Sequence, residues 1–338
     1  MKAVALTRYL PISDPESLID VELPKPEPRA HDLLVRVEAV SVNPVDTKQR
    51  APKPGVEAHP KVLGYDAAGV VEAVGADVTL FKPGDAVWYA GDITRPGSNA
   101  QYQLVDERIV GHKPKTLDFA RAAALPLTTI TAWELLFDRM RLDLDGADAG
   151  KSLLIIAGVG GVGSIAIQLA RRAGLVVIAT ASRPETVEWC QRMGAQHVID
   201  HRQPLAPQLA ALGFATVDAI ANLADTDRYW TTMGELVAPQ GRIGLIVEPK
   251  GPLPIGGVFK IKCATIAWET MFGRSRFGTP DMVEQHRLLD RAAEWIDKGE
   301  LKNTHTATLG TINATNLRKA HAQLESGTTI GKITLAGW

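Results

Sequence analysis

The stretch Leu153-Leu154-Ile155-Ile156-Ala157-Gly158-Val159-Gly160-Gly161-Val162-Gly163 decides the fold of this chain. An apolar run that enters a glycine-rich turn predicts a strand buried on both faces of a parallel sheet. Apolar residues then recur on a helical period over residues 164–173, and a second apolar run follows at Leu175–Ala179. This order of strand, turn, helix and strand predicts the βαβ unit of a dinucleotide-binding domain.

The spaced glycines of that turn have separate physical tasks. Gly158 permits a sharp bend, Gly160 lets backbone N–H groups approach a pyrophosphate, and Gly163 lets helix and strand pack closely. Gly161 and Val162 complete the predicted phosphate-binding segment, at a helix N-terminus that favours negative charge. The alternative is an ordinary glycine-rich turn of an α/β protein.

The residues after the second strand predict which dinucleotide binds. A carboxylate there would accept hydrogen bonds from the ribose of NAD and repel a 2′-phosphate, but this chain has Thr180, Ser182 and Arg183. An arginine pairs well with phosphate, so the sequence predicts NADP(H). His201 and Arg202, which follow a third apolar run, are expected near the same phosphate if the two strands are neighbours. For Arg183 and His201 the alternative is a surface residue without a cofactor role.

Length and composition limit the class of protein. A chain of 338 residues is expected to form two domains, and a net charge of −1 argues against a nucleic-acid partner. No apolar run approaches the roughly 20 residues that span a bilayer, and no signal peptide is evident, so we expect no membrane partner and a cytoplasmic location. Two distant cysteines cannot form a disulfide framework or a structural zinc cluster.

The chain before about Leu125 has the pattern of a β domain. Short β-rich runs alternate there with turn clusters that contain proline and glycine. The runs lie at residues 1–6, 33–41, 68–74, 86–88 and 102–105. Within this part, Gly64-Tyr65-Asp66 begins a series of glycines spaced along predicted strands, and Lys82-Pro83-Gly84-Asp85 follows. Glycines inside strands mark bends or close backbone approach.

Taken together, these two motifs and the glycine turn resemble the medium-chain dehydrogenase/reductase superfamily. The resemblance covers nearly the whole chain. It implies an α/β fold with two domains, a doubly wound parallel Rossmann sheet at 126–268 and a GroES-like, mostly β catalytic domain at 1–125 and 269–338. It also implies an active site in the cleft between the domains, with Lys332 near the cofactor.

The superfamily contains zinc enzymes and zinc-free enzymes, and this chain resembles the latter. At the positions that match the catalytic zinc ligands of alcohol dehydrogenases it has Asn43, Tyr65 and Leu125 or a neighbour. None supplies the sulfur or imidazole nitrogen that zinc needs, so no metal site is predicted. The segment Asn43-Pro44-Val45-Asp46 is similar to the zinc-free quinone oxidoreductase branch, also called zeta-crystallin-like.

Further cofactor contacts follow from the resemblance and from strand ends. A threonine on the helix expected at 127–137, for which we favour Thr131, is implied to contact the nicotinamide or its ribose; a bond back to its own helix is the alternative. Leu223 and Val247 fall at the carboxyl ends of predicted strands, where open α/β sheets bind ligands. Their main chain is expected to hold the carboxamide of the nicotinamide.

The segment Trp268-Glu269-Thr270-Met271-Phe272 resembles one subgroup of the quinone reductase-like branch. A strand is expected over residues 260–268, and in superfamily members the equivalent strand pairs with its copy in a second subunit. The resemblance therefore implies a homodimer. Trp268 or Phe272 is expected to wall the substrate pocket with a flat apolar surface, a place in the core being the alternative.

The candidate groups for chemistry are the Asn43 amide, the Tyr65 hydroxyl and Lys48. Relatives often have a tyrosine where this chain has Lys48, and this lysine could donate a proton or simply be solvated. Asp46 could orient Lys48 or only cap a short helix that begins after Pro44. The sequence thus predicts an oxidoreductase that transfers a hydride from NADPH to a quinone or an α,β-unsaturated carbonyl without a metal. The alternatives are a zinc-type alcohol dehydrogenase and an NADPH-binding sensor or structural protein with little turnover.

Overall fold

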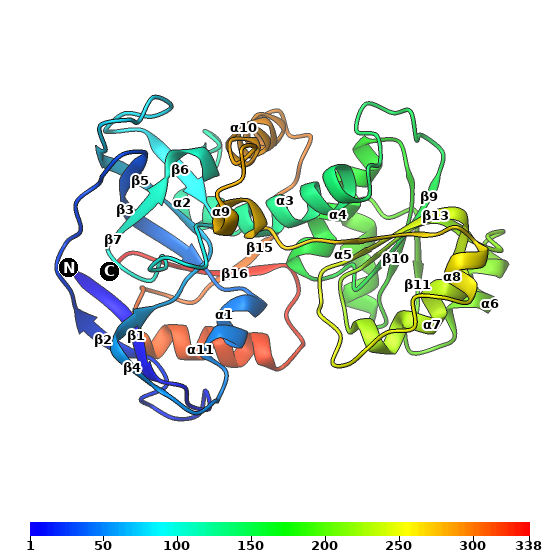
Figure 1. Ribbon diagram of the computed structural model, residues 1–338, viewed down its shortest axis with the longest axis horizontal. Coiled ribbons are helices and arrows are strands. Elements are labelled where there is room, and N and C mark those ends of the chain that lie inside the picture. The colour runs from blue at the N-terminus through cyan, green and yellow to red at the C-terminus, as the bar shows by residue number, and fades with distance from the viewer. The chain divides into compact units, whose positions relative to one another are not determined.

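The computed structural model describes residues 1–338, which divide into two compact units. Unit 1 contains Met1–Leu127 and Phe272–Trp338, and unit 2 contains Thr128–Met271. Unit 2 is therefore inserted into unit 1 in sequence, with boundaries two and three residues later than those expected from the sequence. Figure 1 labels the elements of both units.

Unit 1 is mostly β and contains two sheets. A three-stranded sheet has the order β2 (Ile19–Glu22), β1 (Lys2–Arg8) and β4 (Val56–Val62). The larger sheet has the order β15 (His305–Thr308), β16 (Lys332–Ala336), β3 (Asp32–Ser41), β5 (Ala67–Val74), β6 (Ala86–Tyr89) and β8 (Val110–His112), and β7 (Tyr102–Asp106) also pairs with β3. This arrangement confirms the expected mostly β domain.

Strand β3 is the centre of the larger sheet. Its antiparallel partners are β5 along most of its length, β7 over Asp32–Arg36 and β16 over Ala39–Ser41. Val35 and Val37 are buried while Arg36 between them is exposed, which is the period of two that a half-buried strand requires. The final strand of the chain therefore joins the sheet beside one of its earliest strands.

The helices of unit 1 are short except for the two near its C-terminal end. The short ones are α1 (Pro44–Arg50), α2 (Phe119–Ala123), α9 (Gly273–Phe277) and the 3-10 turn Glu107–Ile109. The longer ones are α10 (Glu284–Asp297) and α11 (Ala314–Glu325). Thr279-Pro280 is typical of a helix start in the sequence, yet α10 begins only at Glu284. The Thr279 hydroxyl donates to Asp281 Oδ1 and closes a separate turn.

Unit 2 contains the predicted doubly wound parallel sheet. Its strand order is β11 (His197–Ile199), β10 (Val176–Thr180), β9 (Ser152–Ile156), β12 (Val217–Asn222), β13 (Val237–Leu245) and β14 (Thr265–Trp268), and all neighbouring pairs are parallel. Strand order therefore runs outward in both directions from β9, which enters the glycine turn. Ligand sites of such sheets lie at this point of reversal, beyond the carboxyl ends of the strands.

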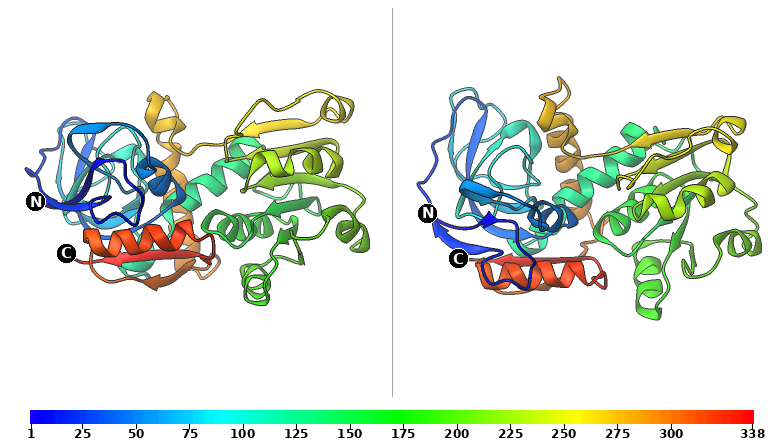
Figure 2. Two further views of the ribbon diagram at one scale, coloured as in Figure 1. Left: turned by 90° about the horizontal axis from the view of Figure 1, so that it is seen from below. Right: turned by 60° about the horizontal axis from the view of Figure 1, so that its bottom comes forward.

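Helices pack on both faces of that sheet (Figure 2). Helix α4 (Gly161–Arg172) packs on β9, β10 and α5 (Pro184–Met193). Helices α6 (Leu205–Ala211), α7 (Thr226–Leu236) and α8 (Val258–Ile261) form a second group, and their apolar side chains share a buried cluster with Leu154 and Ile156. Every residue of β9 is buried, as the unbroken apolar run predicts.

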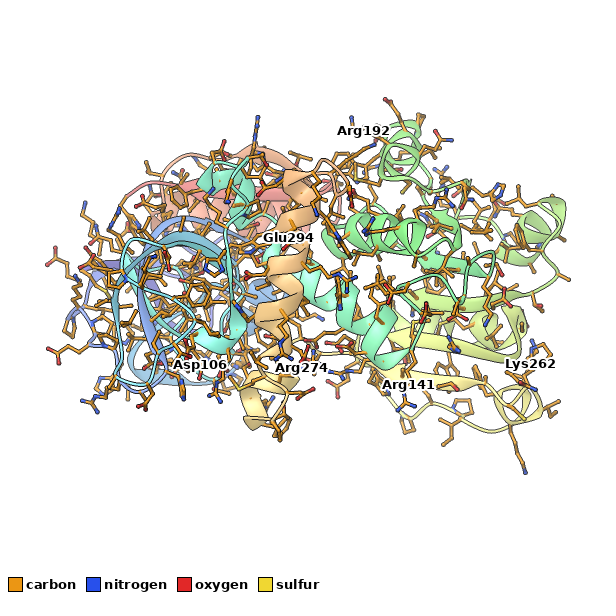
Figure 3. The ribbon with its side chains drawn as sticks, turned by 90° about the horizontal axis from the view of Figure 1, so that it is seen from above. Asp106, Arg141, Arg192, Lys262, Arg274 and Glu294 are labelled. Carbon is orange, nitrogen blue, oxygen red and sulfur yellow. The ribbon has the colours of Figure 1, made fainter.

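Two segments of unit 2 differ from the prediction. The helix expected at 127–137 consists of α3 (Pro126–Trp133) followed by the π-helix η2 (Glu134–Arg139). The strand expected at 260–268 begins only at Thr265, because the preceding residues form α8. Lys262, labelled in Figure 3, donates from Nζ to the carbonyl oxygens of Gly234, Glu235 and Val237 at the end of α7, a long-range contact that local patterns do not encode.

No helix of the structure combines the length and the apolar character that crossing a membrane would require.

Candidate functional site

A buried polar cluster in unit 1 begins at the N-terminus of α1. Asn43 is the residue before the helix, and Pro44 fixes its first position. The backbone N–H of Asn43 donates to Asp46 Oδ2 at 2.7 Å, so Asp46 closes the first turn. Asn43 and Asp46 are each 1% exposed. The polar start of this short helix is thus held inside the unit.

Lys332 and Asp66 complete this cluster with Asn43. The Lys332 ammonium donates to Asn43 Oδ1 at 2.5 Å, to Asp66 Oδ2 at 3.0 Å and to the carbonyl of Val42 at 2.8 Å. Asn43 Nδ2 also donates to Asp66 Oδ2, and the N–H of Leu127 donates to Asp66 Oδ1 at 2.7 Å. The three donors of the ammonium therefore each have an acceptor, as a buried cation requires.

Asp46 adds a second carboxyl group to this region with no second cation. Asp46 Oδ1 is buried and has no hydrogen-bond donor. Burial raises the pKa of Asp46 to about 7, although the Asn43 N–H and the Lys332 charge act in the opposite direction. Burial also raises the pKa of Asp66, against the charge of Lys332. Near neutral pH the cluster therefore exchanges a proton at Asp46.

Tyr65 adjoins the cluster through its backbone carbonyl and carries a hydroxyl group. Its ring is buried and lies edge-on to Phe272, with 5.4 Å between the ring centroids. The hydroxyl makes no hydrogen bond within the chain, whereas the Tyr65 carbonyl accepts one from Asn43 Nδ2 at 3.4 Å. Burial raises the pKa of Tyr65, which keeps the hydroxyl protonated at neutral pH. It can therefore donate a hydrogen bond to a ligand.

Two other predicted site residues, Lys48 and Trp268, take no part in the hydrogen bonds of this cluster. Lys48 is exposed on α1 and takes no part in the hydrogen bonds around Asp66. Trp268 is 48% exposed at the end of β14, so it is not the core aromatic that we had considered as its alternative role. Phe272, by contrast, is buried against Tyr65.

In unit 2 the chain packs closely at Gly163 of the glycine turn, as the sequence predicts. A Cβ at Gly163 would lie 2.5 Å from the carbonyl oxygen of Ala157 and 2.7 Å from Gly158 Cα, so a side chain is excluded. At Gly160 the nearest atom would be 4.0 Å away, which leaves the backbone open to a ligand. Ala157 itself has φ of 66°, a left-handed conformation that costs free energy in a residue with Cβ.

Helix α4 begins directly after this turn. Gly160 caps it without a side-chain hydrogen bond, so no side chain of the cap competes for the N–H groups of the first turn, where Gly161, Val162 and Gly163 lie. The predicted contact Thr180 is buried, and its hydroxyl accepts the Ala157 N–H at 3.0 Å. Thr180 therefore fixes the strained residue at the entry of the turn.

Cationic side chains gather beyond β10 and β11. Arg183, directly before α5, pairs with Glu185 at 3.1 Å, and Ser182 is partly exposed beside it. Arg202 donates from Nη2 to the Ser182 carbonyl at 2.8 Å and pairs with Asp200. These contacts connect the two strand ends where a 2′-phosphate was predicted.

His201 lies partly exposed in the same region. The Arg228 guanidinium donates to its carbonyl at 3.4 Å. Burial lowers the pKa of His201, opposed by Asp200. His201 therefore adds no charge at neutral pH, and the arginines supply the positive charge.

The ends of β12 and β13 carry the remaining predicted contacts. The Leu223 N–H donates to the Ile156 carbonyl, and the Val247 carbonyl accepts the Thr226 hydroxyl. Asn222, which lies at the end of β12, is fully buried and its Nδ2 has no acceptor. Thr131 is buried on α3.

Four residues of these sites make contacts that the sequence did not predict. Asp66 was noted only as part of a motif, and Lys332 only as a residue near the cofactor. Asp46 was expected to orient Lys48 or to cap the helix after Pro44, and Arg202 was expected near the 2′-phosphate with His201, but their contacts with Asn43 and Ser182 were not foreseen. The signal that the sequence offered for these residues was their type, because charged residues inside apolar runs are unusual unless they are paired. Lys332, between Gly331 and Ile333, is an example.

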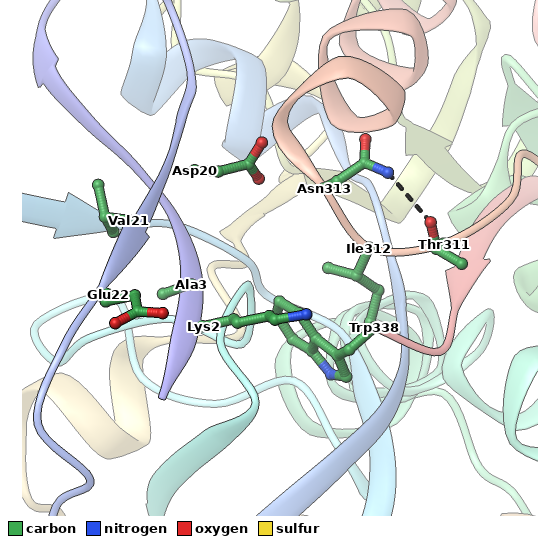
Figure 4. Close-up of a pocket in the computed structure, with 9 residues that line it drawn as sticks. All are labelled: Lys2, Ala3, Asp20, Val21, Glu22, Thr311, Ile312, Asn313 and Trp338. Atoms are coloured by element: carbon green, nitrogen blue, oxygen red, sulfur yellow. Dashed lines mark hydrogen bonds between the residues drawn. The ribbon is translucent and has the colours of Figure 1, made fainter.

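A pocket of about 470 Å³ lies elsewhere in unit 1, between β1, β2 and the loop before α11 (Figure 4). Lys2, Asp20, Glu22 and Trp338 are among the residues that line it. None of the predicted site residues lies there.

Comparison with known proteins identifies the family. Residues 29–115 match the model for the alcohol dehydrogenase GroES-like domain, and residues 193–335 match the model for zinc-binding dehydrogenases. Zinc-type alcohol dehydrogenase-like proteins of Staphylococcus aureus are 44% identical over 99% of both chains. The chain belongs to the medium-chain dehydrogenase/reductase superfamily. It is an oxidoreductase of that superfamily, whose members bind nicotinamide cofactors.

Other relatives of this medium-chain dehydrogenase/reductase differ in their named activities. A solved structure from Rhizobium etli, provisionally named a zinc-dependent alcohol dehydrogenase, has 55% identity and a TM-score of 0.95, and the match covers 100% of this chain and 98% of that one. The NADPH-dependent alkenal/one oxidoreductase of Arabidopsis thaliana is 33% identical over 69% of this chain and 68% of its own. A quinone oxidoreductase of Pseudomonas syringae has 26% identity and a TM-score of 0.82 over 99% of both chains.

The residues of this family member do not fit the zinc that some of these names imply. Asn43 and Asp66 are already engaged by the Lys332 ammonium, which would repel a divalent cation. Tyr65 and Leu125 add no sulfur or imidazole ligand. No group of three or more His, Cys, Asp or Glu side chains in the structure is arranged to hold a metal ion.

The first prediction concerns the Lys332–Asp66 pair. Replacing Lys332 by methionine leaves Asp66 buried without its cation, and we expect the free energy of unfolding to fall by about 3–5 kcal/mol. Urea unfolding measures it. The double variant D66N/K332M should lose less than the sum of the single losses, because neither partner is then left charged. Lys250→Met removes an exposed lysine and should change stability by less than about 1 kcal/mol. Additive losses would contradict the coupling.

Proposed function

We propose that this chain is an NADPH-dependent reductase that transfers a hydride to quinones or α,β-unsaturated carbonyl compounds without a catalytic metal. The observation that carries the proposal is the Lys332 ammonium, 2.5 Å from Asn43 Oδ1 and 3.0 Å from Asp66 Oδ2. Asn43 stands where the resemblance places the first cysteine ligand of zinc enzymes. A cation of the protein itself therefore engages that position.

Residues that do not fit a zinc ion favour a conjugated acceptor. Hydride addition to a simple ketone puts a full charge on one oxygen, which zinc stabilises in metal enzymes. Addition to the β-carbon of an enone, or to a quinone, spreads the charge over an enolate or a hydroquinone anion. A hydrogen bond from Tyr65 would stabilise this anion, and a proton taken up at carbon or oxygen then completes the reduction. Burial keeps the Tyr65 hydroxyl protonated for this role.

NADPH, when bound, supplies the hydride. The backbone around Gly160 is open for the pyrophosphate, and α4 begins there with its N–H groups. Arg183, Ser182 and Arg202 would hold the 2′-phosphate. Thr131 and the main chain at Leu223 and Val247 would orient the nicotinamide. Each of these positions lies at the carboxyl end of a strand of the sheet or on α3 and α4.

The relatives support the choice of reaction. The Arabidopsis protein is named for NADPH-dependent reduction of alkenals and alkenones, and the Pseudomonas syringae protein for quinones. A zinc-type alcohol dehydrogenase is the second candidate, favoured by the names of the Staphylococcus aureus relatives. An NADPH-binding protein with little turnover is the third.

The second prediction tests the reaction. Purified protein should oxidise NADPH with a naphthoquinone or a short enone, and a chelator should leave the rate unchanged. Tyr65→Phe should lower kcat by roughly 100-fold, the usual size of a positioned proton donor, with little change in NADPH affinity. The control is Tyr89→Phe, which removes another buried hydroxyl without a partner and should not alter kcat.

Two outcomes would overturn this assignment, and a third would change the role of Tyr65. Loss of activity on chelation with recovery on added zinc would favour the alcohol dehydrogenase. Thermal stabilisation by NADPH without oxidation by any acceptor would favour a sensor or structural protein. Equal rates for Tyr65→Phe and the unsubstituted chain would remove Tyr65 from the mechanism.

The third prediction concerns the dinucleotide. Arg183→Ala should lower kcat/KM for NADPH by about 10- to 100-fold, the worth of a charge-assisted hydrogen bond, and leave NADH nearly unaffected. Arg192→Ala, at the other end of α5 (Figure 3), removes the same charge away from the site and is the control. A similar loss with both dinucleotides would show that Arg183 does not contact the 2′-phosphate.

We also propose a homodimer formed through β14. This strand is at the edge of its sheet and pairs only with β13, so one row of its backbone groups has no strand partner. Ile255 and Ile261, in the segment before it, are 73% and 83% exposed, which is unusual for isoleucine. The superfamily resemblance implies that this strand pairs with its copy.

The fourth prediction follows from that surface. The unsubstituted chain should have twice the monomer mass in light scattering, and Ile261→Glu should shift the equilibrium toward the monomer by burying a charge at the interface. Phe277→Glu changes another exposed apolar residue, 76% exposed in unit 1, and should leave the mass unchanged. A monomer for the unsubstituted chain would contradict the proposal.

A further inference from the structure

Two buried glutamates in unit 2 take no part in the chemistry proposed above. Glu134 is the first residue of the π-helix, and Glu269 directly follows β14. Both side chains are completely buried. Buried carboxylates are rare unless they are paired, and π-helical turns are frequent at functional sites.

The pair has one cation for two carboxyl groups. Arg139, on the same π-helix, donates from Nε to Glu269 Oε2 at 2.8 Å and from Nη2 to Glu134 Oε2 at 3.3 Å. No N–H or O–H group donates to Glu269 Oε1, which is buried beside Glu134. Burial, and then the neighbouring Glu134, raise the pKa of Glu269 to about 9. Glu269 therefore carries a proton at neutral pH, which it can donate to Glu134.

The pair connects the elements that carry the predicted nicotinamide contacts. The Glu269 N–H donates to the Leu245 carbonyl at 2.9 Å, at the end of β13 and two residues before Val247. Glu134 lies three residues after Thr131 on the continuous α3 and π-helical segment. The proton between the glutamates therefore joins the ends of β13 and β14 to the segment that presents Thr131.

We propose that Glu134 and Glu269, through one shared proton, are positioning residues that hold the nicotinamide end of the dinucleotide site. The inference rests on the proposed binding of NADPH, in particular on the nicotinamide contacts at Thr131 and Val247. Neither glutamate touches the reacting atoms in this proposal. Their task is to keep the helix and the strand ends at a fixed distance.

The charges around the pair set its response to pH. The elements packed there carry Asp138 and Arg139 on the π-helix, Arg141 just after it (Figure 3), and Arg242 on β13, which pairs with Asp148. Of these, Arg139 is the cation bonded to both glutamates.

Because the pKa of Glu269 in the folded chain is above that of an exposed glutamate, the folded state binds the extra proton. The contribution of Glu269 to the free energy of unfolding therefore falls as pH rises from the ordinary glutamate range to about 9. The arrangement of the pair changes only near pH 9, when the proton leaves and two buried carboxylates repel each other.

The fifth prediction tests this with binding titrations of the full chain between pH 7 and pH 10. We expect the affinity for NADPH to fall above pH 9, by at most about tenfold per pH unit for one proton. The affinity for 2′,5′-ADP, which has no nicotinamide, should not show this fall. Glu269→Gln keeps a neutral hydrogen-bond donor at every pH and should abolish the fall. Glu269→Ala should weaken NADPH binding across the whole range and leave 2′,5′-ADP binding unchanged.

The matched control is Glu294→Gln, an exposed glutamate of α10 in unit 1 (Figure 3), which should behave like the unsubstituted chain. An alkaline fall that persists in Glu269→Gln, or that occurs equally for 2′,5′-ADP, would overturn the inference. Failure of the proposed reaction is separately visible, because NADPH binding is measured without an acceptor. If the chain binds only NADH, titration of NADH against AMP makes the same comparison.

Discussion

The buried ion pair between Lys332 and Asp66 is the interaction on which the organisation of unit 1 depends. The two residues are 266 positions apart in sequence, and their charges meet at 3.0 Å in a region closed to solvent. Removing two charges from water costs several kcal/mol for each, so the pair is tolerated only because the Lys332 ammonium and both Asp66 oxygens have hydrogen-bond partners. Asp66 accepts from Lys332, Asn43 and the N–H of Leu127. One carboxylate thus fixes strand β16 and the first turns of α1 and α3.

This constraint also explains how a chain whose residues do not fit zinc, in a family with zinc names, holds its site in place. In a zinc enzyme the metal links ligands from separate segments. Here the ammonium of Lys332 performs that linking through Asn43 Oδ1 and the Val42 carbonyl, while the Tyr65 hydroxyl stays without a partner inside the chain. Lys332 therefore keeps the backbone segments in place, while the neighbouring Tyr65 keeps a hydroxyl that can donate to a ligand. In unit 2 the proton between Glu134 and Glu269 has a comparable role, with Arg139 as the cation.

The sequence could predict those features of the fold that depend on local residue patterns or on periodicity. The apolar run before Gly158 predicted β9, because a strand buried on both faces consists of apolar residues. The glycine spacing up to Gly163 predicted the turn and α4, because close backbone contacts exclude side chains. The doubly wound sheet and the mostly β domain followed from the same patterns and from the family resemblance. The prediction of a strand over residues 260–268 was wrong for its first half, because the helix α8 forms there. This helix is stabilised by packing on α7 and not by its own periodicity.

The polar clusters could not be predicted in this way. Lys332, Asp66 and Asn43 lie on three segments that are separate in sequence. No local pattern around one of them predicts its contact with the other two. The same holds for Glu134 and Glu269, whose meeting depends on the register of β14 against β13 and on the π-helical turn. The predicted proton donor Lys48 was chosen by its place in a motif, yet the helix directs it to solvent while Asp46 is turned inward.

The place of β16 in the sheet has a consequence for biosynthesis. Because residues 332–336 pair with β3, the segment Asp32–Ser41 emerges from the ribosome long before the strand that covers part of its edge. Unit 2 is continuous in sequence and can fold during that interval, whereas the carboxylate of Asp66 must wait for its lysine. Chemistry that depends on the cluster thus begins only after Lys332 has been synthesised, and until then part of the β3 edge lacks its strand partner.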